Sequence, residues 1–417
     1  MKRVILSIVV FFILISSIYL LPYTSSQDKS GRIAFLVNSS IYPEIKDELS
    51  EVFEKMEYYD FVMEDIQNQN PSQIRAWLKM QYENYGLVGA VLVGDIPLAR
   101  YHNPIFNETL DFPYYYMNLD GLWKDENGDG IIESIPQNYT PQIWVGILRS
   151  TDIDGNNITQ ISDYIQRVLK YFDGKIGVEP KSGAFIDNDF LWIADKLGFS
   201  LSYPYVGYKM VDNSTKDAFL KFINESYPYA FIVVHSNGTE YFIKQDGIWE
   251  PVYPWEIKSR VLFYVDQSCY GGDFNKGAIA NHLIMSKNSQ SLGVLTFTAM
   301  GTVSDMESFH IALGKGKSFG DALLHYIQNV THNATNFNRY IAMLSYLGFP
   351  FLKPWRPSGY KEMPPISIDG NQELRAYAKK YGWPGKGTEK DPIQITGIMI
   401  FTGYWRDGLS WKYIHLC

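Results

Sequence analysis

The chain has 417 residues, 46% of them hydrophobic and 20% charged, which is typical of a globular protein able to bury a large core. Its net charge of −8 provides no basic surface for phosphate backbones, so the composition argues against nucleic acid as a partner. With Cys269 and Cys417 as its two cysteines, the protein has no disulfide framework and depends on its core for stability.

Residues 1–27 have the pattern of a signal peptide or a signal anchor. The basic stretch Met1-Lys2-Arg3 precedes an apolar run at 4–21, which ends at Pro22. The run is long for the core of a signal peptide and just long enough to span a bilayer. We favour cleavage within 23–27, and membrane anchoring through residues 4–21 is the alternative. Either way, we expect the remainder to be secreted or displayed on the extracellular surface.

Nine Asn-x-Ser/Thr sequons agree with export, because such sites receive N-glycans in secreted proteins. They begin at Asn38, Asn107, Asn138, Asn157, Asn213, Asn224, Asn237, Asn329 and Asn333. Together they favour a glycosylated surface protein.

Residues 28–175 are expected to form a first α/β unit. Apolar runs of strand length lie at 31–36, 60–63, 87–93 and 142–147, and amphipathic helical patterns lie at 42–58, 71–85 and 158–172. The run at 87–93 is apolar throughout, as in a strand buried on both faces. Strands that alternate with helices predict a parallel sheet with helical crossovers.

An acidic loop interrupts this unit. Three oxygen-bearing side chains alternate ahead of Gly130, as in the first half of a calcium-binding loop. Position twelve of the loop is Pro136, so the bidentate glutamate of an EF-hand is absent, and Asp111 or Asp120 upstream are further candidate donors. The alternative is a solvated acidic turn. The predicted structural Ca²⁺ ligands are Asp125, Asn127, Asp129 and Glu133.

Residues 176–355 are expected to form a second α/β unit. Strands are predicted at 183–186, 205–210, 230–235, 260–268 and 292–297, and helices at 190–197, 215–224, 278–286 and 318–327. A proline-containing linker then leads into a short β-rich tail, so that 356–417 form a separate segment. The predicted fold class is therefore α/β, with mostly parallel sheets and helices on both faces.

Two residues with catalytic potential end apolar strands of the second unit. His235 and Cys269 are 34 residues apart, which is enough for a crossover between parallel neighbours. A thiol beside an imidazole is the pairing of a cysteine nucleophile with its base. Backbone N–H groups of Gly238 and of Cys269 are the expected oxyanion donors. The plain alternatives are a buried core thiol and a histidine with a structural role.

The segment Gln267-Ser268-Cys269-Tyr270-Gly271 is close to the local signature of caspases. Over residues 85–353 the chain resembles the gingipain family of caspase-like cysteine peptidases, through blocks at 92–95, 115–130, 145–148, 269–274 and 347–350. The resemblance implies two side-by-side caspase-like (Rossmann-like) units. It also implies a Cys269–His235 dyad in the second unit, structural calcium, no organic cofactor, and protein or peptide substrates.

The chain departs from the family pattern at several positions. Ser236 and Asn237 separate His235 from Gly238, and Phe349 replaces the aspartate of the closing block. An acid that orients the histidine is expected at Asp187 or Asp189, whereas Asp266 is expected to be structural. The tail resembles the start of a NosD-like β-helix, through Gly382-Trp383, Gly387-Thr388 and Asp391-Pro392.

Three functional hypotheses follow. The first is an exported cysteine endopeptidase that uses Cys269 and His235. The second is a catalytically inactive, caspase-like surface or binding module. The third, weaker hypothesis is a thiol acyl-transfer enzyme that joins chains.

Overall fold

A computed structural model describes the chain at residues 31–56, 59–104, 107–176, 182–191, 208–210, 214–301, 306–332, 341–354, 361–363, 370–381, 383–386, 388, 391–394 and 398–400. The predicted signal segment at 1–27 and most of the predicted helix at 190–197 lie outside these ranges. Within them, no helix is both long and apolar enough to cross a bilayer.

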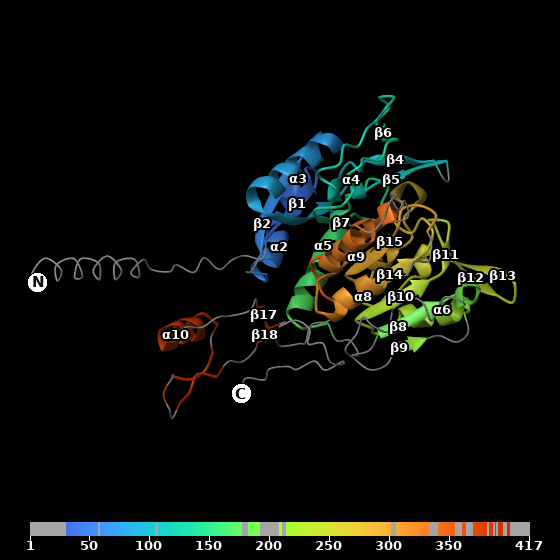
Figure 1. Ribbon diagram of the computed structural model, residues 1–417. Coiled ribbons are helices and arrows are strands. Elements are labelled where there is room, and N and C mark those ends of the chain that lie inside the picture. The colour runs from blue at the N-terminus through green and yellow to red at the C-terminus, as the bar shows by residue number, and fades with distance from the viewer. Residues whose placement is uncertain are drawn as a thin grey trace, which may run out of the picture.

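The described strands build a ten-stranded sheet (Figure 1). In spatial order they are β2 (Asp60–Ile66), β1 (Arg32–Asn38), β3 (Leu87–Val93), β7 (Trp144–Leu148), β16 (Leu344–Gly348), β15 (Gly293–Phe297), β14 (Phe263–Gln267), β10 (Tyr229–Val233), β8 (Ser182–Ile186) and β9 (Tyr208–Met210). Every neighbouring pair is parallel except β15 and β16. The predicted parallel sheet is therefore confirmed, and the strands of both predicted units share it.

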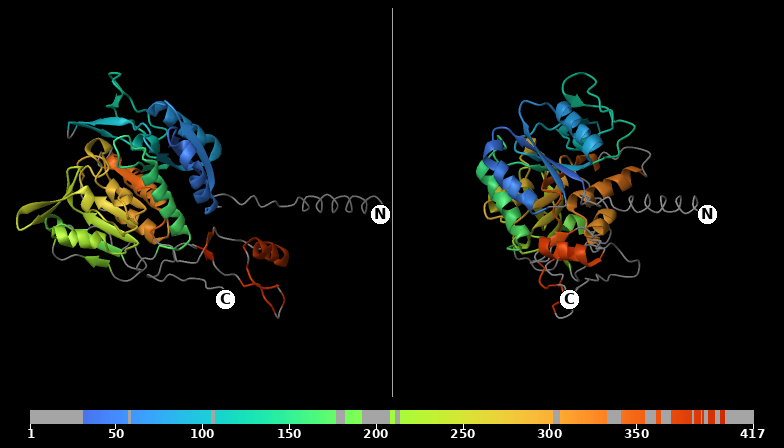
Figure 2. Two further views of the ribbon diagram at one scale, coloured as in Figure 1. Left: turned by 180° about the vertical axis from the view of Figure 1, so that it is seen from behind. Right: turned by 90° about the vertical axis from the view of Figure 1, so that its left-hand side faces the viewer.

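Helices cover both faces of the sheet (Figure 2). Neighbouring helices α2 (Tyr42–Glu54), α5 (Ile158–Phe172) and α7 (Asn281–Met285) form one group, and α8 (Glu307–Gly314) packs on α9 (Phe319–His332). In the described part of the α/β body the other helices are α3 (Pro71–Tyr85), α4 (Tyr114–Met117) and α6 (Lys216–Ile223), with short 3-10 turns at Pro254–Glu256, Phe274–Lys276 and Ile341–Met343. The fold class is thus the predicted one, an α/β protein with a mostly parallel sheet.

Two small sheets project from the body. The first comprises β4 (Arg100–Asn103), β5 (Glu108–Asp111) and β6 (Ile131–Ile132), and the second comprises β11 (His235–Ser236), β12 (Tyr241–Gln245) and β13 (Ile248–Val252). In the tail, β17 (Lys361–Met363) pairs with β18 (Ile398–Ile400), and α10 (Gly370–Tyr381) is a helix that the sequence analysis did not predict.

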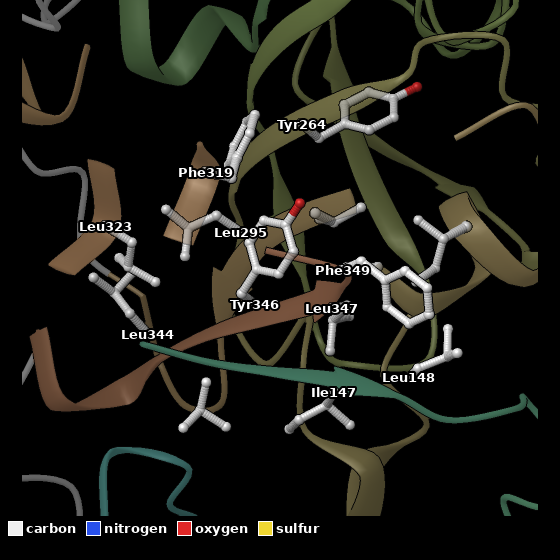
Figure 3. Close-up of a cluster of buried hydrophobic side chains, with 14 of the residues drawn as sticks. Ile147, Leu148, Tyr264, Leu295, Phe319, Leu323, Leu344, Tyr346, Leu347 and Phe349 are labelled. Atoms are coloured by element: carbon white, nitrogen blue, oxygen red, sulfur yellow. The ribbon is translucent and has the colours of Figure 1, made fainter. Parts of the chain in front are cut away.

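Buried aromatic and aliphatic side chains fill the join between β7 and β16 (Figure 3). Phe349, directly after β16, is fully buried, and its ring lies 5.3 Å from Phe35 and 5.0 Å from Tyr164. The Tyr164 hydroxyl accepts from the Phe349 N–H and donates to the Leu292 carbonyl, so its polar group is satisfied inside the core. The phenylalanine that departs from the family pattern is therefore a core residue where the first and second parts of the chain meet.

Candidate active site

The sheet register places the two candidate catalytic residues after the ends of neighbouring strands. Strands β10 and β14 are parallel neighbours, and Val233 is paired with Gln267. His235 and Cys269 each follow two residues after that pair. Both residues therefore lie just beyond the carboxyl edge of the sheet, after neighbouring strands that are about 4.8 Å apart. Both are half-buried, unlike the buried strand residues that precede them.

A tight turn follows Cys269. Tyr270 has a φ of +58°, in the left-handed region, and its N–H donates to the Ala299 carbonyl at 2.8 Å. The chain closes the turn with the Asp273 N–H donating to the Tyr270 carbonyl. Gly271 is required here, because a Cβ at this position would lie 2.4 Å from Thr296 Oγ1. The thiol therefore stands at a corner of the chain.

The surroundings of the Cys269 thiol favour its protonated form. Burial raises the pKa of Cys269, and the nearby carboxylates of Asp266 and Glu108 raise it further. A hydrogen bond from the Gly301 backbone N–H and the charge of Lys276 oppose these effects on the pKa but do not outweigh them. Because the thiolate is the reactive species, this cysteine depends on a base to remove its proton.

Strand β11 and the aromatic residues around it hold His235 in position. The imidazole lies against Phe190, with ring centroids 4.6 Å apart, and meets Trp249 edge to face at 4.5 Å. Its Nε2 atom is 3.6 Å from Asp189 Oδ2, and it has no hydrogen-bond partner among the described residues. Asp189 is also ion-paired with Lys244, whose Nζ lies 3.0 Å from the same oxygen.

The two candidate orienting acids have different places. Asp187 is fully buried, and its carboxylate accepts hydrogen bonds from the backbone N–H groups of Asp189 and Lys244. It thereby fastens the loop after β8 to β12. Of these two acids, Asp189 is the one that lies within ion-pair distance of His235 in the described part of the chain.

The expected oxyanion donor at Gly238 is already engaged. Its N–H donates to Ser236 Oγ at 3.0 Å, so the inserted serine takes the hydrogen bond that an oxyanion would need. Gly238 instead joins the two loops: its carbonyl accepts from the Ile279 N–H, and a Cβ there would lie 3.2 Å from the Cβ of Tyr270. In the described part of the chain, the Cys269 N–H has no acceptor, which leaves it available as a donor.

A buried acid lies directly beneath the Cys269 turn. Asp266 is fully buried in β14, and its Oδ2 accepts hydrogen bonds from the hydroxyls of Tyr241, Ser268 and Thr296. Burial raises its pKa to about 7, although those three hydrogen bonds lower it. The role expected for Asp266 from the sequence is structural. An aspartate inside an otherwise apolar strand is the feature of the sequence that indicates a buried hydrogen-bond network at this position.

The acidic loop gathers three of the four side chains predicted as calcium ligands. Carboxylate oxygens of Asp125, Asp129 and Glu133 lie within 4.8 Å of one another. The Asp125 carboxylate accepts hydrogen bonds from the backbone N–H groups of Gly128, Asp129 and Gly130, which folds the loop around it. Asn127 Nδ2 donates hydrogen bonds to the carboxylates of Asp129 and Glu133, and its Oδ1 accepts from the Asp129 N–H. Hard oxygen donors of this kind fit Ca²⁺.

Comparisons with known proteins add a relationship in fold. No model of a known protein family matches the chain, and no curated protein matches it in sequence. A solved structure described as "Structure of Protease" matches with a TM-score of 0.55, covering 82% of this chain and 83% of that chain at 13% sequence identity. At this identity the likeness concerns the fold, and the chain is therefore similar in architecture to a protein described as a protease.

Proposed function

We propose that the protein is a cysteine endopeptidase that hydrolyses peptide bonds with Cys269 as nucleophile and His235 as base. The observation that carries the proposal is the register of β10 and β14, in which His235 and Cys269 follow paired residues of neighbouring strands. The fold shared with a solved protease supports a peptidase in a coarser sense. The substrates are accordingly proteins or peptides.

The chemistry requires two steps. His235 takes the proton of the Cys269 thiol, the sulfur attacks the scissile carbonyl carbon, and the C–N bond breaks as the imidazolium returns the proton to the leaving amine. Water, deprotonated by His235, then attacks the thioester and releases the acid and the thiol. The N–H of Cys269 is the proposed donor to the oxyanion, and Asp189 stabilises the imidazolium charge.

The proposal includes export and structural calcium. The basic and apolar amino-terminal sequence and the nine sequons support a secreted or surface-anchored glycoprotein. Asp125, Asn127, Asp129 and Glu133 would hold Ca²⁺, which would neutralise the clustered carboxylates and stabilise the loop. The ion has no part in the bond-breaking steps.

The proposal is tested by profiling cleavage of a peptide library by the full chain with Ca²⁺. Cys269→Ala and His235→Ala serve as matched controls. We expect cleavage that requires both side chains, together with covalent labelling of Cys269 by a peptidyl electrophile. Cleavage that persists in Cys269→Ala would refute the assigned nucleophile.

A catalytically inactive binding module is the second candidate, and two observations favour it. Burial holds the pKa of the Cys269 thiol above its ordinary value, and Ser236 occupies the Gly238 N–H. This candidate predicts that Cys269 resists peptidyl electrophiles at neutral pH and that no library peptide is cleaved.

An added amine nucleophile in the same assay distinguishes acyl transfer from hydrolysis by its products.

A further inference from the structure

The residue after the nucleophile adopts a conformation that its side chain disfavours. Tyr270 has a φ of +58°, a region in which a Cβ crowds the following carbonyl. Residues held in such conformations persist where the surrounding structure imposes them. Backbone hydrogen bonds hold both sides of the Tyr270 peptide, since its N–H donates to Ala299 and its carbonyl accepts from Asp273. Its side chain has a separate anchor.

That anchor comes from a distant part of the chain. The Tyr270 hydroxyl donates to the carboxylate of Glu108, with Oη 2.9 Å and 2.8 Å from its two oxygens. Glu108 begins β5, in the small sheet that projects from the first part of the chain. Lys276 completes the cluster: its Nζ lies 3.6 Å from Glu108 and 3.3 Å from the centroid of the Tyr270 ring. All three side chains are half-buried.

We propose that Glu108 is a positioning residue: by holding the Tyr270 hydroxyl, it keeps Tyr270 in the left-handed conformation and so sets the corner at which Cys269 is presented. The inference rests on the proposed function of Cys269 as nucleophile. It makes β5, which contains no catalytic residue, part of the apparatus that controls the thiol.

Glu108 also acts on Cys269 through its charge. Among the ionisable groups around the thiol, the carboxylates of Asp266 and Glu108 raise its pKa and Lys276 lowers it. Removing the Glu108 charge should therefore lower the pKa of Cys269, whereas removing the Tyr270 hydroxyl should leave that charge in place. This difference separates the effect on the thiol from a general loss of structure.

The experiment measures alkylation of Cys269 by iodoacetamide across pH in the full chain. Peptide-level mass spectrometry distinguishes it from Cys417, the other thiol. Glu108→Ala and Tyr270→Phe should each slow alkylation about tenfold at high pH, and the double variant should be no slower than either. Glu108→Gln, which keeps an acceptor for the hydroxyl, should retain most of the rate. Glu108→Ala and Glu108→Gln should shift the pH midpoint downward, and Tyr270→Phe should not.

Glycine at position 270 provides the decisive comparison, because glycine adopts a positive φ without steric cost. In a Tyr270→Gly background, Glu108→Ala should no longer change the limiting rate. Thermal unfolding midpoints of all variants establish that they are folded. If Glu108→Ala is not folded, Tyr270→Phe tests the effect on the limiting rate and Glu108→Gln tests the effect on the pH midpoint.

Three results would overturn the inference. The first is an unchanged alkylation rate in both single variants. The second is a loss of rate in the double variant that equals the sum of the single losses. The third is a loss of rate on Glu108→Ala that is as large with glycine at position 270 as with tyrosine. Unchanged alkylation combined with an altered preference for basic peptides would assign Glu108 to substrate binding instead. The alkylation pattern is read without any peptide cleavage, so it stands or fails separately from the proposed peptidase activity.

Discussion

Replacing Asp266 by asparagine should change how the stability of the protein depends on pH. The carboxyl group is fully buried in β14, and its Oδ1 has no hydrogen-bond partner among the described residues. Asparagine is nearly the same size, and its side-chain oxygen can accept the hydroxyls of Tyr241, Ser268 and Thr296. The substitution therefore removes the titration of residue 266 while leaving an acceptor in the network.

The magnitude follows from the pKa values. Burial raises the pKa of Asp266 from 3.8 to about 7, so the folded protein keeps a proton that the unfolded chain has already lost. Stability is then greatest below the unfolded pKa and falls as pH rises toward 7. Between pH 5 and about pH 7 the folded state binds one more proton than the unfolded chain. Over these two pH units the free energy of unfolding falls by about 1.4 kcal/mol per unit. From pH 5 to pH 8 the free energy of unfolding of the wild type should therefore fall by about 3 kcal/mol more than that of the variant.

Urea unfolding of the wild type and Asp266→Asn at pH 5 and pH 8, at fixed Ca²⁺ and ionic strength, measures this difference. Other groups whose pKa is raised, such as Asp273 at about 6, titrate in both proteins and cancel in the comparison. Asp217→Asn, which replaces an exposed aspartate on α6, is the matched control for the exchange of aspartate for asparagine. An identical pH dependence for wild type and Asp266→Asn would show that Asp266 ionises normally and would refute the reasoning.

Three further predictions concern the loop, the core and the turn. Relative to chelator, Ca²⁺ should raise the thermal unfolding midpoint of the wild type more than that of Glu133→Gln. Equal shifts in the two proteins would show that Glu133 is not a ligand of the ion. Phe349→Ala should cost about 3–5 kcal/mol of unfolding free energy in urea, because it leaves a cavity among fully buried rings. Gly271→Ala should cost about 1–3 kcal/mol and slow Cys269 alkylation, because the new methyl group would meet Thr296; wild-type values would contradict the crowding.

Elements with local signals at their ends were predictable from sequence. Helix α3 begins and ends where expected, because Asn70 and Gln73 form a capping box and Gly86 ends the helix in the left-handed region. Helix α5 likewise begins after the cap residue Asn157. The apolar run of β3 was equally clear, since a strand buried on both faces leaves no polar residues to interrupt it.

Features that depend on contacts distant in sequence were not predictable. Strands β11 to β13 are short and only partly buried, so their pairing leaves no strong alternation in the sequence. Asp187 and Asp189 are indistinguishable as residue types, and the contacts with His235 and Lys244 are what separate them. The anchoring of Tyr270 by Glu108 joins residues 162 positions apart. Such pairings are decided by tertiary packing, which a single sequence does not display.

The position of β16 has a consequence for how the protein is made. This strand is the last of the ten in the chain, yet it lies between β7 and β15 near the middle of the sheet. During synthesis, the edges of β7 and β15 that face β16 therefore stay unpaired until residues beyond Gly348 have left the ribosome. Unpaired edges invite association between chains, and contacts of such long range form slowly. Nascent chains that stop before Leu344 should consequently be the aggregation-prone species, whereas chains that include β16 can close the sheet.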